Sequence, residues 1–311
     1  LFFSGEYDEG FLNDDRTVEH AHLHHKSFYL KARVTTTFTF TAGVDHFVMW
    51  GGQSPRYGQL PTDFKAYLKY ILGKTGSSEF PTTDQLNVAG NQYGSYQFQF
   101  EKESSIGKFT LYLSHPFDDF SGVNWRNWCD NLYGLQWQNK HKQSFVTTLL
   151  YEYTDTRQQS IKGYKLDYWD PVKQDSAHIT DVDDYFNHGV YRSGVTYHNY
   201  GMVSPLFMPV VVEDGISQGF QSTRFTAHHI GVDGNLSDQL NWQALLTYMN
   251  QLGRYNHDYS TPHKQLSTEL SLNYSNDKLP VDFSVSGGAD FKNYAQNIVG
   301  VTIKVCWHLL P

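Results

Sequence analysis

The chain has 311 residues and a formal net charge of −8, and its mean hydropathy is −0.53. It contains no run of eighteen apolar residues, which excludes a helical membrane protein, and no basic stripe that would indicate a nucleic-acid partner. Aromatic residues make up 16% of the chain, with 22 tyrosines and 21 phenylalanines against 4 methionines. That excess favours β-structure and the aromatic girdles of membrane barrels.

Taken in order, the chain is predicted to form strands in which apolar and polar residues alternate with a period of two. Leu1–Tyr7 is expected to be the tail of a first strand, and Asp8–His25 a polar loop. The later strands are marked by apolar rows within Phe28–Val34, Phe38–Val44, Tyr96–Phe100, Phe109–Leu113, Leu135–Trp137, Phe145–Tyr153, Phe225–Ala227, Trp242–Tyr248, Leu266–Tyr274, Val281–Val285 and Val299–Trp307.

The segment from Lys264 to Trp307 shows the pattern most clearly. Leu270 and Leu272 belong to an apolar row, and Glu269 lies in the polar row between them. Such strands suit an antiparallel transmembrane β-barrel, apolar toward lipid and polar toward the lumen. A soluble all-β domain is the alternative. The charged residues expected to line the lumen, where opposite charges can pair, are Lys31, Arg33, Glu101, Glu152, Asp282 and Lys304.

The predicted connections alternate in length, which favours an outer-membrane barrel with short periplasmic turns and long extracellular loops. The short turns fall near residues 35–37, 103–107, 139–143, 233–238 and 276–280, and the long loops near 46–93, 115–130, 156–221, 251–263 and, less markedly, 291–296. About twelve strands are expected in all, with both chain ends on the periplasmic side. The chain starts abruptly at Leu1-Phe2-Phe3 without a visible signal peptide, so we expect an N-terminal part to be absent.

Two local features complete this outline. Residues 63–72 have helical spacing, with Phe64, Tyr67, Leu68 and Ile71 on one face and Gly73 as a stop. The two cysteines, Cys129 and Cys306, are expected to be free thiols rather than a disulfide.

Four stretches of the sequence resemble the Wzi family of capsule-assembly outer-membrane proteins: Asp45–Gly52, Pro61–Leu68, Gly90–Tyr96 and Tyr185–His198. The resemblance implies a barrel of about 18 strands whose outer mouth is partly closed by long loops. Residues 1–311 would then form a single β-barrel domain that lacks its N-terminal strands. The implied function is to bind or anchor capsular polysaccharide at the bacterial outer membrane, without enzymatic activity. The alternatives are a porin-like transport barrel and a scaffold subunit of a larger outer-membrane complex.

Aromatic rings that stack on sugar rings, flanked by planar hydrogen-bonding groups, are the chemistry expected of a polysaccharide site. The long loops supply the candidates Trp125, Trp128, Tyr168, Trp169, Tyr191, Arg192, Tyr197 and His198. The same rings can instead pack the loops together or form the interfacial girdle. We expect the loop from Thr156 to Gln221 to fold over or into the mouth, with Arg192 as its central anchor.

No metal or cofactor is expected. A metal held by His20, His22, His24 and His25 is less favoured than a solvated loop. Calcium at Asp181, Asp183 and Asp184 lacks the pattern of an EF-hand. Ser193 and His198 lie near each other in sequence, but no G-x-S-x-G motif accompanies them.

The expected partners are those of an outer-membrane barrel. They are surface or capsular polysaccharide, outer-membrane lipid and lipopolysaccharide, other outer-membrane proteins, and the barrel-insertion machinery during assembly. The last of these is expected because Gly300, Ile303, Val305 and Trp307 resemble the terminal pattern that this machinery recognises.

Overall fold

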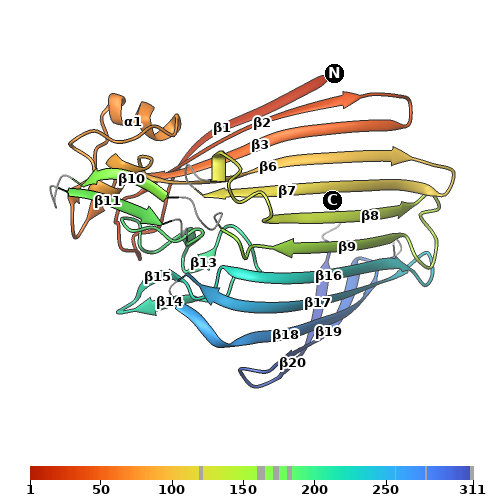
Figure 1. Cartoon of the computed structure of the whole chain (residues 1–311). Coiled ribbons are helices and arrows are strands. Elements are labelled where there is room, and N and C mark those ends of the chain that lie inside the picture. Colours follow the sequence, from red (N-terminus) through yellow and green to blue (C-terminus); the bar gives the residue numbers. More distant parts are fainter. Residues whose placement is uncertain are drawn as a thin grey trace.

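The computed structural model describes residues 1–118, 122–159, 165–170, 175–180, 184–255, 257–276 and 279–308, with the backbone alone at 165–170 and 175–180. Its main element is a 12-stranded antiparallel sheet in which each strand pairs with the next one along the chain (Figure 1). The predicted number of strands is confirmed. The strands are β1 (Phe2–Phe11), β2 (His22–Arg33), β3 (Phe38–Trp50), β6 (Asn91–Glu103), β7 (Gly107–Asp118), β8 (Asn131–Asn139), β9 (Thr148–Asp155), β16 (Arg224–Asn235), β17 (Leu240–Arg254), β18 (His257–Tyr274), β19 (Val281–Lys292) and β20 (Ile298–Trp307).

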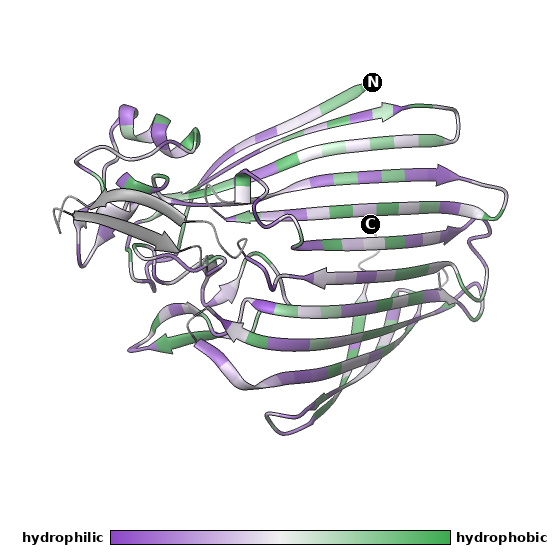
Figure 2. Cartoon of the chain, in the orientation of Figure 1, coloured by the Kyte–Doolittle hydropathy of each residue, from purple (hydrophilic) through white to green (hydrophobic). Residues whose placement is uncertain are grey.

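The sheet has one apolar face and one polar face, seen as alternating bands along the strands in Figure 2. Leu270 pairs with Gly287 and with Ala244, whereas its neighbour Glu269 pairs with Gly288 and with Leu245 on the opposite face. The apolar face is open: Leu270 is 54% exposed and Ile303 is 71% exposed. An exposed apolar row of this kind marks an interaction surface.

The polar face carries paired charges and a cavity. Lys31 Nζ lies 3.1 Å from Glu101 Oε2, and Lys108 Nζ lies 3.1 Å from the other oxygen of the same carboxylate. The predicted pairing of opposite charges on this face is therefore confirmed for Lys31 and Glu101. Farther along the sheet, Thr247, Glu269 and Asp290 are among the residues that line a cavity of about 550 Å³.

The sheet is open rather than closed into a cylinder. In the described part of the chain, β1 and β20 are its two edges and do not pair with each other. The short turns gather at one end of the sheet, and α1 (Phe64–Ile71), β10 (Lys165–Asp170), β11 (Asp175–Thr180) and the remaining short elements at the other (Figure 1). Those remaining elements are α2 (Thr82–Leu86), β4 (Gln53–Ser54), β5 (Gly58–Gln59), β12 (Thr196–Tyr197), β13 (Tyr200–Gly201), β14 (Val210–Glu213) and β15 (Ile216–Phe220).

Two predicted loops are partly strand. Residues 8–11 and 22–25 of the predicted loop Asp8–His25 lie in β1 and β2, and 251–263 is largely occupied by β17 and β18, whose pairing continues to Arg254 and His257. Beyond the apolar rows, the ends of these strands carry polar side chains on both faces, so the period-two pattern does not identify these residues as strand. There the ladder of backbone hydrogen bonds continues the strands.

Helix α1 forms where predicted, but it packs through a different face. The Asp63 side chain caps it by accepting from the backbone N–H groups of Lys65 and Ala66. The buried residues are Ala66 and Tyr70, which pack with Val48, Trp50 and Phe80, while Phe64 is exposed. Of the predicted apolar face, Tyr67 packs against this cluster, whereas Phe64 and Leu68 are exposed, because tertiary contacts selected the Ala66–Tyr70 side.

The described residues contain no helix that is both long and apolar enough to cross a membrane. Cys129 and Cys306 are both free, as predicted.

Candidate functional site

The loops at the long-loop end form one packed body, here called the loop layer (residues 12–21, 51–60 and 184–223). Its core contains Tyr185, Phe186, Val190 and Tyr191, all nearly inaccessible to solvent. These side chains pack against Met49 and Tyr93, which lie on the polar face of β3 and β6. At this end of the sheet the polar face becomes apolar, with Leu23 and Phe47 also packed against the cluster. Residues 185–220 of the Thr156–Gln221 loop thus pack onto the polar face at this end of the sheet, in line with the prediction that the loop folds inward.

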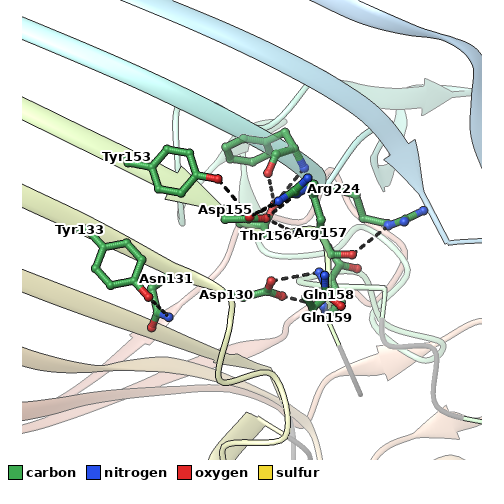
Figure 3. Close-up of polar contacts among 11 residues, drawn as sticks. Asp130, Asn131, Tyr133, Tyr153, Asp155, Thr156, Arg157, Gln158, Gln159 and Arg224 are labelled. Atoms are coloured by element: carbon green, nitrogen blue, oxygen red, sulfur yellow. Dashed lines mark hydrogen bonds and ion pairs between the residues drawn. The ribbon is translucent and has the colours of Figure 1, made fainter. Parts of the chain in front are cut away.

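The base of the long loop is held by a buried carboxylate (Figure 3). Asp130, which immediately precedes β8, accepts hydrogen bonds from the backbone N–H of Gln158 at 2.9 Å and of Gln159 at 2.6 Å. It also accepts one from the Tyr185 hydroxyl at 3.0 Å. These bonds alone would favour the charged form, but burial outweighs them and raises the pKa of Asp130 to about 6.

Both ends of the same loop meet beside Asp130. The Thr156 hydroxyl donates to the Thr223 carbonyl at 2.6 Å and accepts from the Phe225 N–H at 3.1 Å. Arg157 binds the Asp155 carboxylate through Nε and Nη2, and Arg224 Nε donates to the Arg157 carbonyl at 3.3 Å (Figure 3). The two ends of the loop are therefore hydrogen-bonded to each other where the loop joins the sheet.

The central anchor of the loop layer is Arg16, which is only 3% exposed. Its guanidinium donates to the carbonyls of Thr196 at 3.0 Å and Gly194 at 3.4 Å. Burial lowers the pKa of Arg16 to about 10, which leaves it charged at neutral pH. The prediction of Arg192 as anchor is wrong: its side chain is exposed. Charge alone does not show which arginine is buried.

The structure separates the predicted site residues rather than gathering them. Trp125 stacks on His115, with ring centroids 4.1 Å apart, and on Tyr96, a residue of the apolar face. Trp128 is exposed. Tyr191 is buried, and its hydroxyl donates to the Gly51 carbonyl at 3.1 Å, so this ring supports the loop layer from within.

The other candidates fall into two groups. Tyr168 and Trp169 lie in β10, where only the backbone is described, and Asp181 and Asp183 lie outside the described residues. Tyr197 and His198 are both exposed, at the tip of the β12–β13 hairpin.

That hairpin tip is the best-formed aromatic surface of the loop layer. Tyr197 and Tyr200 face each other in the β12–β13 pairing, and His198 and Asn199 turn the chain with φ of 46° and 66°. Two consecutive left-handed residues make a tight turn of the type that favours asparagine. Tyr200 is 80% exposed, and sequence reasoning missed it. The sequence signal that could have identified Tyr200 is Asn199 in a two-residue turn between two tyrosines.

No nucleophile–base pair forms from Ser193 and His198. The Ser193 hydroxyl accepts from the Thr17 N–H at 2.9 Å and donates to the Thr17 hydroxyl at 3.3 Å. His198 is exposed on the hairpin, and its backbone N–H binds Asn13 Oδ1 at 3.1 Å. Within the loop layer, Ser193 thus joins residues 184–223 to residues 12–21.

Together these features define an all-β protein with an open 12-stranded antiparallel sheet and a folded loop layer at one end. No protein-family model and no curated protein matches the sequence. Among solved structures, the chain is similar to Escherichia coli Wzi, described as an outer-membrane protein involved in group 1 capsule assembly and a carbohydrate-binding β-barrel. The TM-score is 0.59 at 13% identity, over 97% of this chain and 55% of that one. The chain has a Wzi-like fold and spans about half the length of that structure.

The first prediction tests the anchor. Arg16→Ala removes the guanidinium donor from the buried Thr196 carbonyl and one of the two donors from the Gly194 carbonyl, which keeps the Thr196 N–H, at a cost of about 1–3 kcal/mol. We expect limited proteolysis within 184–223 to be about tenfold faster or more, because cleavage follows the population of the opened loop. Arg192→Ala is the matched control and should leave the cleavage rate unchanged. Equal rates for the two variants would contradict the assignment.

The second prediction concerns pH. Because burial raises the pKa of Asp130 to about 6, the folded loop binds a proton more tightly than the unfolded chain. The contribution of Asp130 to stability therefore falls as pH rises from about 4 to 6, by up to about 3 kcal/mol. Asp130→Asn removes this titration. We expect the difference in unfolding free energy between the native protein and the variant to change across that window and to be flat from pH 7 to 8.

Proposed function

We propose that this chain is part of an outer-membrane β-barrel that binds surface polysaccharide through its loop layer and performs no catalysis. The observation that carries the proposal is the combination of an open apolar sheet face with a locked loop layer that presents Tyr197, His198 and Tyr200. Exposed aromatic rings beside hydrogen-bonding side chains suit the two faces of a sugar ring. The Wzi-like fold supports this function, since that structure is described as a carbohydrate-binding barrel.

The proposed binding surface differs from the one expected from sequence. It keeps Tyr197, His198 and the exposed Arg192, and it adds Tyr200. Trp128 remains a candidate through its exposure. Tyr191 is left out, because its buried ring offers no face to a ligand.

Outer-membrane placement follows from the apolar face in this proposal. Residues such as Leu270, Val301 and Ile303 would contact lipid, including lipopolysaccharide, and the polar face would line the lumen. Residues 1–311 would contribute to one barrel domain.

The third prediction tests the glycan surface. We expect the double variant Tyr197→Ala/Tyr200→Ala to lose about tenfold or more in affinity, since each stacked ring contributes about 0.5–1.5 kcal/mol. The probe is capsular polysaccharide extracted from the bacterium that carries the gene, titrated into the folded protein in detergent. Phe145→Ala is the matched control, because this exposed ring stacks on Trp242 beside the short turns. Unchanged affinity in the double variant, or an equal loss in the control, would count against the surface.

The fourth prediction tests the membrane-facing side. Leu270→Arg should cost about 2–4 kcal/mol if the residue lies near the bilayer midplane. Glu269→Arg, one residue away on the polar face, should cost far less because its environment is aqueous. Urea titration of the protein folded into lipid vesicles measures both. A larger loss for Glu269→Arg would reverse the assignment of the faces.

A further inference from the structure

A group of metal-ligating side chains lies on the polar face at the β1 edge of the sheet. Glu6 and Asp8 come from β1, and His25 comes from β2, where it is the direct partner of Asp8. One ligand atom from each of these three residues lies within 4.8 Å of the others. His25 Nδ1 and Asp8 Oδ2 are already 3.2 Å apart. The two strands thus present one nitrogen and two carboxylates to the same point.

Contacts on the side of the His25 ring away from Asp8 orient the imidazole. His25 Nε2 lies 3.3 Å from Asp45 Oδ1 on β3, and the second oxygen of Asp45 accepts a hydrogen bond from the Tyr29 hydroxyl. The imidazole also stacks on Phe47, with centroids 4.2 Å apart and planes 13° apart. A carboxylate on one imidazole nitrogen, with the other nitrogen free to coordinate, is the arrangement that orients metal-binding histidines.

The charge at this place is not balanced by the protein. Among the described residues, no lysine or arginine forms an ion pair with Glu6, Asp8 or Asp45; the two aspartates pair with His25. Glu101, elsewhere on the same face, is held by two lysines. A dication would neutralise the two carboxylates that coordinate it.

We propose that Glu6, Asp8 and His25 bind one first-row transition-metal dication, of which Zn²⁺ is the representative, with Asp45 as the outer partner of His25. Zn²⁺ takes imidazole nitrogen and carboxylate oxygen at about 2.0–2.2 Å in a tetrahedral shell, which places its ligands about 3.3–3.6 Å apart. His25 Nδ1 and Asp8 Oδ2 are 3.2 Å apart, close to this range. Glu6 is exposed and free to rotate inward. Calcium prefers six to eight oxygen ligands, and this site offers an imidazole in their place.

The site has a structural consequence that is separate from polysaccharide binding. The metal would cross-link β1, an edge strand, to β2 through side chains, in addition to their backbone ladder. Binding to the folded chain alone stabilises it by mass action.

The experiment is titration of Zn²⁺ into the folded full chain in detergent, with the thermal unfolding midpoint as a second readout. We expect saturable binding of one Zn²⁺ per chain and a rise in the midpoint. His25→Gln should abolish both effects, and Asp45→Asn should weaken binding about 10–100-fold. Glu101→Gln, which removes a carboxylate already paired with lysines on the same face, is the control and should bind as the native protein does.

Three outcomes would overturn the site: no saturable Zn²⁺ binding, unchanged affinity in His25→Gln, or equal weakening in Glu101→Gln. A Ca²⁺ titration that matches Zn²⁺ and is indifferent to His25 would show a general attraction of cations to the carboxylates instead. Circular dichroism of each variant confirms that it is folded. Because Tyr197 and Tyr200 are untouched, polysaccharide affinity reports separately on the proposed function.

Discussion

The structure depends on one constraint: each strand of the sheet places its apolar side chains on one face and its polar side chains on the other. In a sheet with a period of two, this choice fixes the register, because a slip of one residue would place Glu269 among leucines and Leu270 among serines. Backbone pairing carries this choice from strand to strand through the 12-stranded sheet. The long loops then lie at one end of the sheet, and the side chains on the polar face at that end determine which contacts the loops make.

At that end the polar face changes character, and the loop layer follows from it. Leu23, Phe47, Met49 and Tyr93 replace the charged and hydroxyl side chains found farther along the strands. Apolar loop side chains pack there, and the two buried charges, Arg16 and Asp130, fix how they do so. Buried ionised groups are costly unless fully bonded. A loop held through them has few alternative arrangements, so the hairpin at Tyr197–Tyr200 stands on a rigid base.

Structural features that are specified by a few neighbouring residues can be predicted from the sequence. The strand pattern, the alternation of short and long connections and the Asp63 cap of α1 are each encoded within a few residues. Contacts between distant segments are not encoded that way. Arg16 bonds to residues near 195, and Asp130 to residues 158, 159 and 185; nothing near either charge marks it as buried. The His20–His25 run shows the same limit: His24 and His25 turn to opposite faces of β2, and His25 meets Glu6, Asp8 and Asp45 across strands.

The packing of the loop layer also bears on the choice between binding and transport. A transport barrel needs an aqueous path along its polar face. In this chain Tyr185, Phe186 and Tyr191 pack onto that face at the long-loop end, over β3 and β6. Opening a path there would expose these rings and break the Arg16 and Asp130 hydrogen bonds together, since all belong to one layer. Each unpaired buried group costs about 1–3 kcal/mol, so the loop layer packed onto the polar face is the low-energy state. A binding surface uses that rigidity, whereas a pore would have to overcome it.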